Sequence, residues 1–184
     1  RNKEDPTTDE IYHTGTVAKI VKQIKMPDGN TTIFIMGRMR FKIEKFTQSE
    51  PYFAAKVQYM EDHFPKEDPE FDALISSLKD QSEQIAQLSP NLPNETSIVL
   101  RNIEHQSFLV HFISSNLSAK LDAKQKLLEE DDVKKRAEKL LNLLQSELQL
   151  LELKNEITNK TRADIDKQQR EYFLQQQLKS IREE

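Results

Sequence analysis

A chain of 184 residues without cysteine has no disulfide framework, no thiol nucleophile and no thiolate ligand for a metal. Its net charge of -4 gives no reason to expect a nucleic-acid partner, and no apolar run approaches the ~18 residues of a membrane span. With 36% hydrophobic and 32% charged residues, the composition predicts a soluble protein with one or two compact domains and modest cores.

Alternation of apolar and polar residues predicts four antiparallel strands in the first sixty positions. The stretch "TVAKIVKQIKM" is followed by the turn sequence "PDGN", in which Gly29 can take a positive φ, and then by "TTIFIMG". Together they predict a β-hairpin, and "RFKIEKF" and "YFAAKVQYM" predict two further strands.

One face of this predicted sheet has to be covered, and the rest of the chain supplies little to cover it. We therefore expect further strands before Arg1. Met26 and Met36 stand at strand spacing and are predicted to lie in the core. Met39 is equally suited to the core and to an adaptable surface.

The spacing of apolar residues changes from two to three and four after the prolines of "HFPKEDPE". This predicts an amphipathic helix from about Pro69 to Leu88, which "SPNLPNE" ends. Shorter helices are predicted in "ETSIVLRNI", "QSFLVHFISSNL" and "AKLDAKQKLLEE". The acidic residues 129–132 are well placed to open the next helix, because a helix N-terminus favours negative charge.

No proline or glycine occurs from Asp132 to Glu184, so an unbroken helix there would reach roughly 80 Å. Its first part carries a leucine stripe that we expect to pack on the helical domain: Leu141, Leu144, Leu148 and Leu151. Its middle is polar. Its last part carries a second apolar face, which we expect to pack on a partner outside the chain: Tyr172, Leu174, Leu178 and Ile181.

The predicted fold class is therefore α+β, with a small antiparallel β domain, a helical bundle and a very long C-terminal helix. The expected divisions are 1–64 for a partial β domain, 65–130 for the helical subdomain and 131–184 for the long helix.

Residues with catalytic chemistry form no recognisable constellation in this sequence. The four histidines show no metal-ligand spacing, and no phosphate-binding GxxxxGK[ST] motif occurs. The acidic residues 129–132 could bind a cation, but a helix start explains them more simply. These residues alone favour a binding or scaffolding segment without catalytic, cofactor-binding or metal-binding residues.

Several motifs nevertheless occur in the order typical of one family. "GTVAKI", then "PDG", then Gly37-x-x-Arg40 in "MGRMRFKI" resemble the N-terminal domain of the Lon ATP-dependent proteases. The segment from "LSAKLDAKQ" to "LQLLEL" resembles the helical part that follows in that family. "QREYFLQQQLKSI" resembles the family motif QREY[YF]LxxQLKAI, with Ser180 in place of the usual alanine and glutamines at two usually charged positions. The resemblance extends from Tyr12 to the end and is weakest over 61–92.

The resemblance implies a parent enzyme that is an ATP-dependent serine endopeptidase, a homohexamer of the AAA+ class that uses ATP and magnesium. The Walker motifs and the Ser-Lys proteolytic dyad would lie outside this segment. Residues at the junction to the ATPase module would then be Arg170, Glu171, Tyr172, Phe173, Leu174, Leu178 and Ile181. The expected location is the bacterial cytoplasm, with the mitochondrial matrix as the alternative.

The leading hypothesis for function is a substrate-recognition and hexamer-assembly region that captures unfolded or damaged proteins for quality control. We expect its apolar capture patch near Met39, Phe41 and Phe53. The alternative is a free-standing helical or coiled-coil adaptor that dimerises through the leucine stripe or the C-terminal apolar face. The leucine stripe is shorter than the ~3–4 heptads expected of a coiled coil. A nucleic-acid binder is the least favoured, since no basic face is visible.

Overall fold

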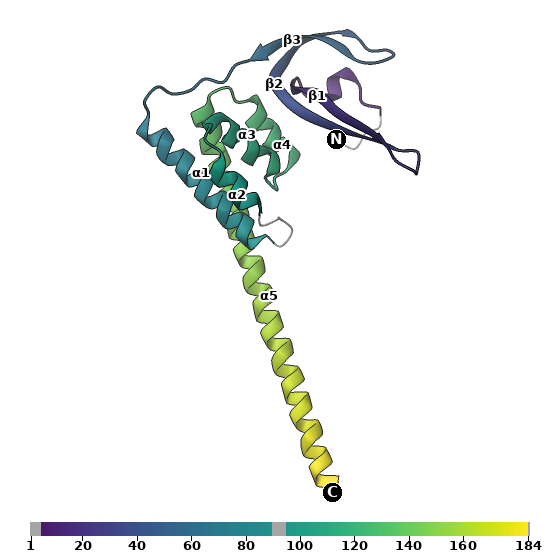
Figure 1. Ribbon diagram of the computed structural model, residues 1–184, viewed down its shortest axis with the longest axis vertical. Coiled ribbons are helices and arrows are strands. Elements are labelled where there is room, and N and C mark those ends of the chain that lie inside the picture. The colour runs from purple at the N-terminus through teal and green to yellow at the C-terminus, as the bar shows by residue number, and fades with distance from the viewer. Residues whose placement is uncertain (1–4, 90–94, 184) are drawn as a thin grey trace.

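A three-stranded sheet lies at one end of the molecule, a cluster of helices lies beside it, and the last helix projects far beyond both (Figure 1). The computed structural model describes residues 5–89 and 95–183, without the side chains of 95–97, 178–181 and 183. The predicted break at "SPNLPNE" therefore falls mostly outside the described residues. None of the described helices is long and apolar enough to cross a membrane.

The sheet has the order β1-β2-β3 and is antiparallel throughout, with β1 at Thr14–Lys25, β2 at Thr31–Gln48 and β3 at Ala54–Met60. The predicted hairpin turn is confirmed: Gly29 has φ 86°, and its N–H donates to the Met26 carbonyl at 3.1 Å. The prediction of four strands is wrong, because "TTIFIMG" and "RFKIEKF" belong to one strand of 18 residues. No residue between them ends the strand, and β-bulges in its pairing accommodate the changes of register.

The β1–β2 hairpin carries many apolar side chains that no described residue covers. Ile20, Phe34 and Ile35 are 61%, 51% and 65% exposed. The prediction that Met26 and Met36 lie in the core is wrong, since both are 45% exposed. Strand spacing places side chains on a face of a sheet, but only a second layer can bury that face.

Four helices form the cluster beside the sheet: α1 at Pro69–Leu88, α2 at Glu95–Asn102, α3 at Gln106–Asn116 and α4 at Leu121–Glu129. A 3-10 turn, η1, precedes the sheet at Thr8–Glu10. α1 begins where predicted because Asp68 caps it: its Oδ1 accepts hydrogen bonds from the N–H groups of Glu70 and Phe71 at 3.0 and 3.2 Å. Pro69, which lacks an N–H to satisfy, is the first helical residue.

α5, at Val133–Glu183, is one unbroken helix of 51 residues, about 77 Å long. The predicted acidic start is confirmed, since Asp132 Oδ1 accepts from the Lys135 N–H at 3.1 Å. The first turns of α5 pack along α1 and supply Val133, Ala137, Leu140 and Leu144 to the core.

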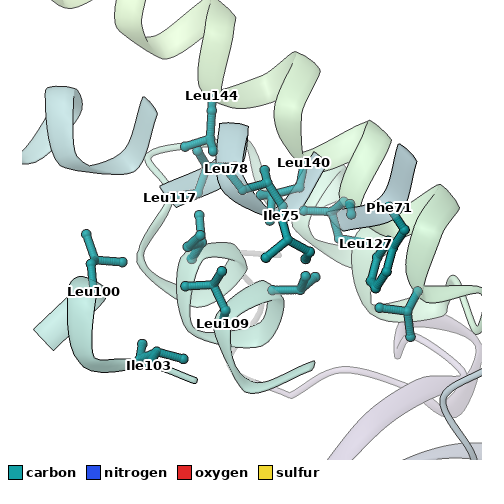
Figure 2. Packing of buried hydrophobic residues seen from close by; sticks show 14 of the residues in the cluster. Phe71, Ile75, Leu78, Leu100, Ile103, Leu109, Leu117, Leu127, Leu140 and Leu144 are labelled. Carbon is teal, nitrogen blue, oxygen red and sulfur yellow. The ribbon is translucent and has the colours of Figure 1, made fainter. Parts of the chain in front are cut away.

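The hydrophobic core lies entirely among the helices (Figure 2). Leu78 of α1, Leu109 of α3 and Leu140 of α5 are fully buried members of this one cluster. The rest of the leucine stripe, Leu141, Leu148 and Leu151, packs against this core in partly buried positions. Beyond residue 155 every described side chain of α5 is exposed, so the second half of the helix has no partner within the described chain.

The position of Leu78 gives a stability test of the helical core. Leu78→Ala removes a fully buried side chain that the surrounding helices hold in place. It should lower the free energy of unfolding by about 2–5 kcal/mol. Leu153→Ala, at a site on α5 that is 52% exposed, should change it by about 0.5 kcal/mol or less. Urea unfolding monitored by circular dichroism measures both changes. Equal losses in the free energy of unfolding for the two variants would contradict this core assignment.

Candidate functional site

Asp62, which follows β3, is the centre of a polar cluster between the sheet and the helices. Its Oδ1 accepts hydrogen bonds from Arg40 of β2 at 2.5 Å and from Arg136 of α5 at 2.8 Å. Its Oδ2 accepts one from Ser107 of α3 at 2.8 Å and lies 3.2 Å from Nε2 of His111. One carboxylate therefore joins the sheet to two helices.

The same two arginines hold the C-terminal end of α4. Arg40 Nη1 donates to the carbonyl oxygens of Leu128 and Glu130 at 2.7 and 2.8 Å. Arg136 Nε donates to the Glu130 carbonyl at 2.9 Å. The last carbonyls of a helix have no partner within the helix, and its dipole favours positive charge there. The guanidinium groups satisfy both requirements.

Burial and hydrogen bonding oppose each other at this cluster. Burial, the largest single effect, would raise the pKa of Asp62, but hydrogen bonds from His111, Arg136 and Ser107 together hold that pKa well below its usual range. The pKa of Arg40 is lowered, first by burial and then by the charge of Arg136, while Asp62 opposes the change. Arg40 and Arg136 are only 6% and 1% exposed, so the cluster is an internal ion network.

Further contacts fix the sheet against the helices around this cluster. The backbone of His63 pairs with the segment before α5, donating to the Asp131 carbonyl at 3.0 Å and accepting from the Val133 N–H at 3.1 Å. The Tyr12 hydroxyl donates to Asp122 of α4 at 2.6 Å, and Gln125 donates to the Thr14 carbonyl at 3.0 Å.

A groove of about 1050 Å³ opens between the sheet and the helices, above the Asp62 cluster. We call it the sheet–helix groove. One wall is formed by residues 37–40 of β2 and Met60 of β3, and the other by one face of α3 and one face of α4. Several apolar side chains line it, of which Met39, Phe108 and Leu121 are 51%, 57% and 54% exposed. Phe112 adds a second ring, with its centroid 6.1 Å from that of Phe108. The groove is thus an accessible, largely apolar surface with a charged floor.

The residues predicted for a capture patch do not all line this groove. Met39 does. Phe41 is half-buried and lies over Gly15, where a Cβ would be only 2.8 Å from its ring. Phe53 is 41% exposed and packs edge-on against Phe46, with ring centroids 6.1 Å apart. The structure therefore makes Met39 a groove residue and Phe41 a packing residue.

The residues predicted for a junction lie on the far half of α5. Tyr172, Phe173 and Leu174 are 65%, 62% and 50% exposed, and Arg170 and Glu171 are also exposed. The side chains of Leu178 and Ile181 lie outside the described residues.

A second groove, of about 910 Å³, lies between α5 and the helices α1 to α3 and includes Leu150 and Phe112.

Neither Asp62 nor Arg136 was singled out by sequence reasoning. One signal was present: Arg136 occupies the same helical face as Val133, Ala137 and Leu140, all of which are buried. A charge on an apolar face indicates a buried ion pair, but not its partner. Among the described residues, no group of three or more His, Asp or Glu is placed to hold a metal ion.

Two solved structures of Lon N-terminal domains share this fold. The N-terminal domain of Mycobacterium avium complex Lon protease superposes with a TM-score of 0.61 at 22% identity, covering 76% of this chain and 74% of that one. The Lon N-terminal domain protein from Xanthomonas campestris gives a TM-score of 0.53 at 19% identity, covering 74% and 71%. At these identities the likeness defines the fold alone.

Comparison of the sequence with known proteins shows the family to which the chain belongs. The sequence profile of the ATP-dependent protease La (LON) substrate-binding domain matches residues 1–146. The Lon protease of Flavobacterium johnsoniae is 47% identical over 182 residues, covering 98% of this chain, and that of Cytophaga hutchinsonii is 46% identical over 185 residues, covering all of it. The chain belongs to the Lon substrate-binding domain family, and the resemblance seen in its motifs is confirmed. It spans 22% and 23% of the lengths of these two relatives.

Removal of the Asp62 charge tests the role of the cluster. Asp62→Asn leaves two buried guanidinium groups without their carboxylate, so it should lower the free energy of unfolding by about 3–5 kcal/mol. Glu44→Gln, which breaks an exposed pair with Lys56, should cost about 1 kcal/mol or less. Urea unfolding at pH 7 measures both losses. If Asp62→Asn costs no more than the control, the cluster does not hold the two parts together.

The depressed pKa of Asp62 also predicts a pH dependence. Because the folded-state pKa is below the unfolded value of about 3.9, the carboxylate stabilises the protein fully above that value. Its contribution declines as the pH falls from about 4 toward the folded-state pKa. The difference in stability between wild type and Asp62→Asn should therefore narrow as the pH falls below about 4. A difference that widens at low pH would contradict the assignment.

Proposed function

We propose that this chain captures unfolded segments of proteins for an ATP-dependent Lon-type serine protease in the bacterial cytoplasm. The observation that supports this proposal is the sheet–helix groove, whose walls carry the exposed side chains of Met39, Phe108 and Leu121. An unfolded protein differs from its folded form mainly in exposing apolar side chains, and an open apolar groove binds those.

The composition of the groove favours broad rather than narrow selectivity. Met39 and Met60 are flexible and polarisable side chains that can adapt to different partners. The aromatic ring of Phe108 offers a large apolar contact area at low entropic cost. Met26 and Met36 of the hairpin do not line the groove but are also exposed.

The remaining parts of the chain fit the same proposal as connecting elements. We propose that 1–64, 65–130 and 131–184 act as three units, of which the long helix joins the capture groove to the ATPase module. Tyr172, Phe173 and Leu174 would pack on that module, because exposed apolar side chains at a helix end indicate a docking face. Hexamer formation would then multiply weak contacts with one substrate. ATP and magnesium would act in the module and not in this segment.

The adaptor hypothesis retains one supporting observation, the exposed apolar residues Leu150, Leu153 and Ile157 on α5. They continue at helical spacing beyond the bundle and could pair with a second copy. Sedimentation equilibrium between about 1 and 100 μM separates the two: a tight dimer at the lowest concentration would favour the adaptor, whereas a monomer would favour the capture segment.

Substitution in the groove tests the proposed function. Met39→Ser and Phe108→Ser together should weaken binding of a chemically unfolded model protein at least tenfold, because they remove two exposed apolar contacts from the groove. The model protein is reduced and alkylated so that it cannot refold, and its native form serves as the non-binding reference. Fluorescence anisotropy measures the affinity.

Leu150→Ser is the matched control, since it removes an exposed apolar side chain from the second groove. It should leave the affinity unchanged. Circular dichroism verifies that each variant folds. Loss of binding by Leu150→Ser alone would move the capture site to the second groove, and unchanged binding by all variants would contradict a site in either groove.

A further inference from the structure

The sheet–helix groove is positively charged in a protein whose net charge is negative. Among the described residues, its lining includes Arg38, Arg40, Lys124 and Arg136 but only one carboxylate, that of Asp62. The formal excess is three positive charges, whereas the whole chain carries -4 at pH 7. A cleft lined by one sign of charge concentrates groups of the opposite sign.

Two of these cations are available to a ligand and two are not. Arg40 and Arg136 are buried and engaged with Asp62 and with the α4 carbonyls, which offset part of their charge. Arg38 is exposed and forms no ion pair with a carboxylate of the described residues. Lys124 is half-buried and donates to the Ser115 carbonyl at 3.0 Å, which leaves further ammonium protons free.

The acidic side chains next to the groove are held by other partners. Asp122 of α4 accepts from the Tyr12 hydroxyl, and Glu129 accepts from Gln125 at 2.8 Å. Glu130 pairs with Lys139 across the first turns of α5. None of these three carboxylates lines the groove, so none of them competes there for direct contact with Arg38 or Lys124.

We propose that the groove selects extended segments in which acidic side chains alternate with apolar ones. This inference rests on the proposed function and adds a charge preference to it. Apolar side chains of the segment contact Met39, Phe108 and Leu121, and its carboxylates lie near Arg38 and Lys124. A guanidinium forms paired hydrogen bonds with a carboxylate, which favours an acidic side chain over an amide of the same shape.

The test compares two fluorescent ten-residue peptides that differ only in charge, both amidated at the C-terminus. One alternates apolar residues with aspartates, and the other has asparagine in place of each aspartate. The 184-residue chain should bind the acidic peptide about four- to twenty-five-fold more tightly at 50 mM salt, which corresponds to about two- to fivefold for each of the two exposed pairs. The preference should shrink at 500 mM salt, because exposed pairs are screened.

The variant Arg38→Gln with Lys124→Gln should lose this preference while it still binds the asparagine peptide. The matched control, Lys19→Gln with Lys22→Gln on the exposed hairpin, makes the same change in net charge outside the groove and should keep the preference. Circular dichroism verifies folding of both variants.

Equal binding of the two peptides would overturn the charge preference and leave the proposed function standing. If both double variants lose the preference for the acidic peptide equally, the groove is overturned as the source of that preference. A further peptide lacks aspartates but has a free C-terminal carboxylate. If it binds as tightly as the acidic peptide, the cations bind a terminal carboxylate, and the acidic side chain is overturned as the ligand. Binding of neither peptide, together with no binding of the unfolded model protein, would overturn the proposed function itself.

Discussion

The hydrogen bonds and ion pairs made by Asp62 are the interaction on which the arrangement of sheet and helices depends. The sheet buries little against the helices, since the hydrophobic core lies among the helices alone. Its position is fixed instead by polar contacts, at the centre of which Arg40 and Arg136 reach the same carboxylate from β2 and from α5. Because both walls of the groove meet at this residue, the width of the groove depends on a polar network and not on apolar packing.

Arginine is the residue that this geometry requires at position 40. Its Nη1 contacts two carbonyl oxygens at the end of α4 while its Nη2 contacts Asp62. A lysine ammonium is a point charge and cannot span the three acceptors with the same fixed geometry. The arginine therefore satisfies the carbonyls at the end of α4 and anchors the sheet there, and Asp62 links it to Arg136 at the start of the long helix.

Sequence reasoning succeeded where local chemistry decides the structure. The prolines before α1, the positive φ at Gly29 and the absence of breakers after Asp132 each act within a few residues, and the elements that they predict are present. It failed for Met26 and Met36, because burial depends on a second layer that strand spacing does not supply. It also missed Asp62, whose partners lie 22 and 74 positions away in the sequence.

The two walls of the groove differ in how firmly they are held, and this difference suits a surface for varied ligands. The helical wall rests on fully buried residues such as Leu109, so its shape is fixed. The sheet wall is anchored at Arg40, but Met39 next to it has an exposed side chain that can adapt its conformation to a ligand. The proposed ligand can then adjust this side chain while the other wall keeps Phe108 and Lys124 in place. The proposed apolar capture and charge preference are compatible in one groove for this reason.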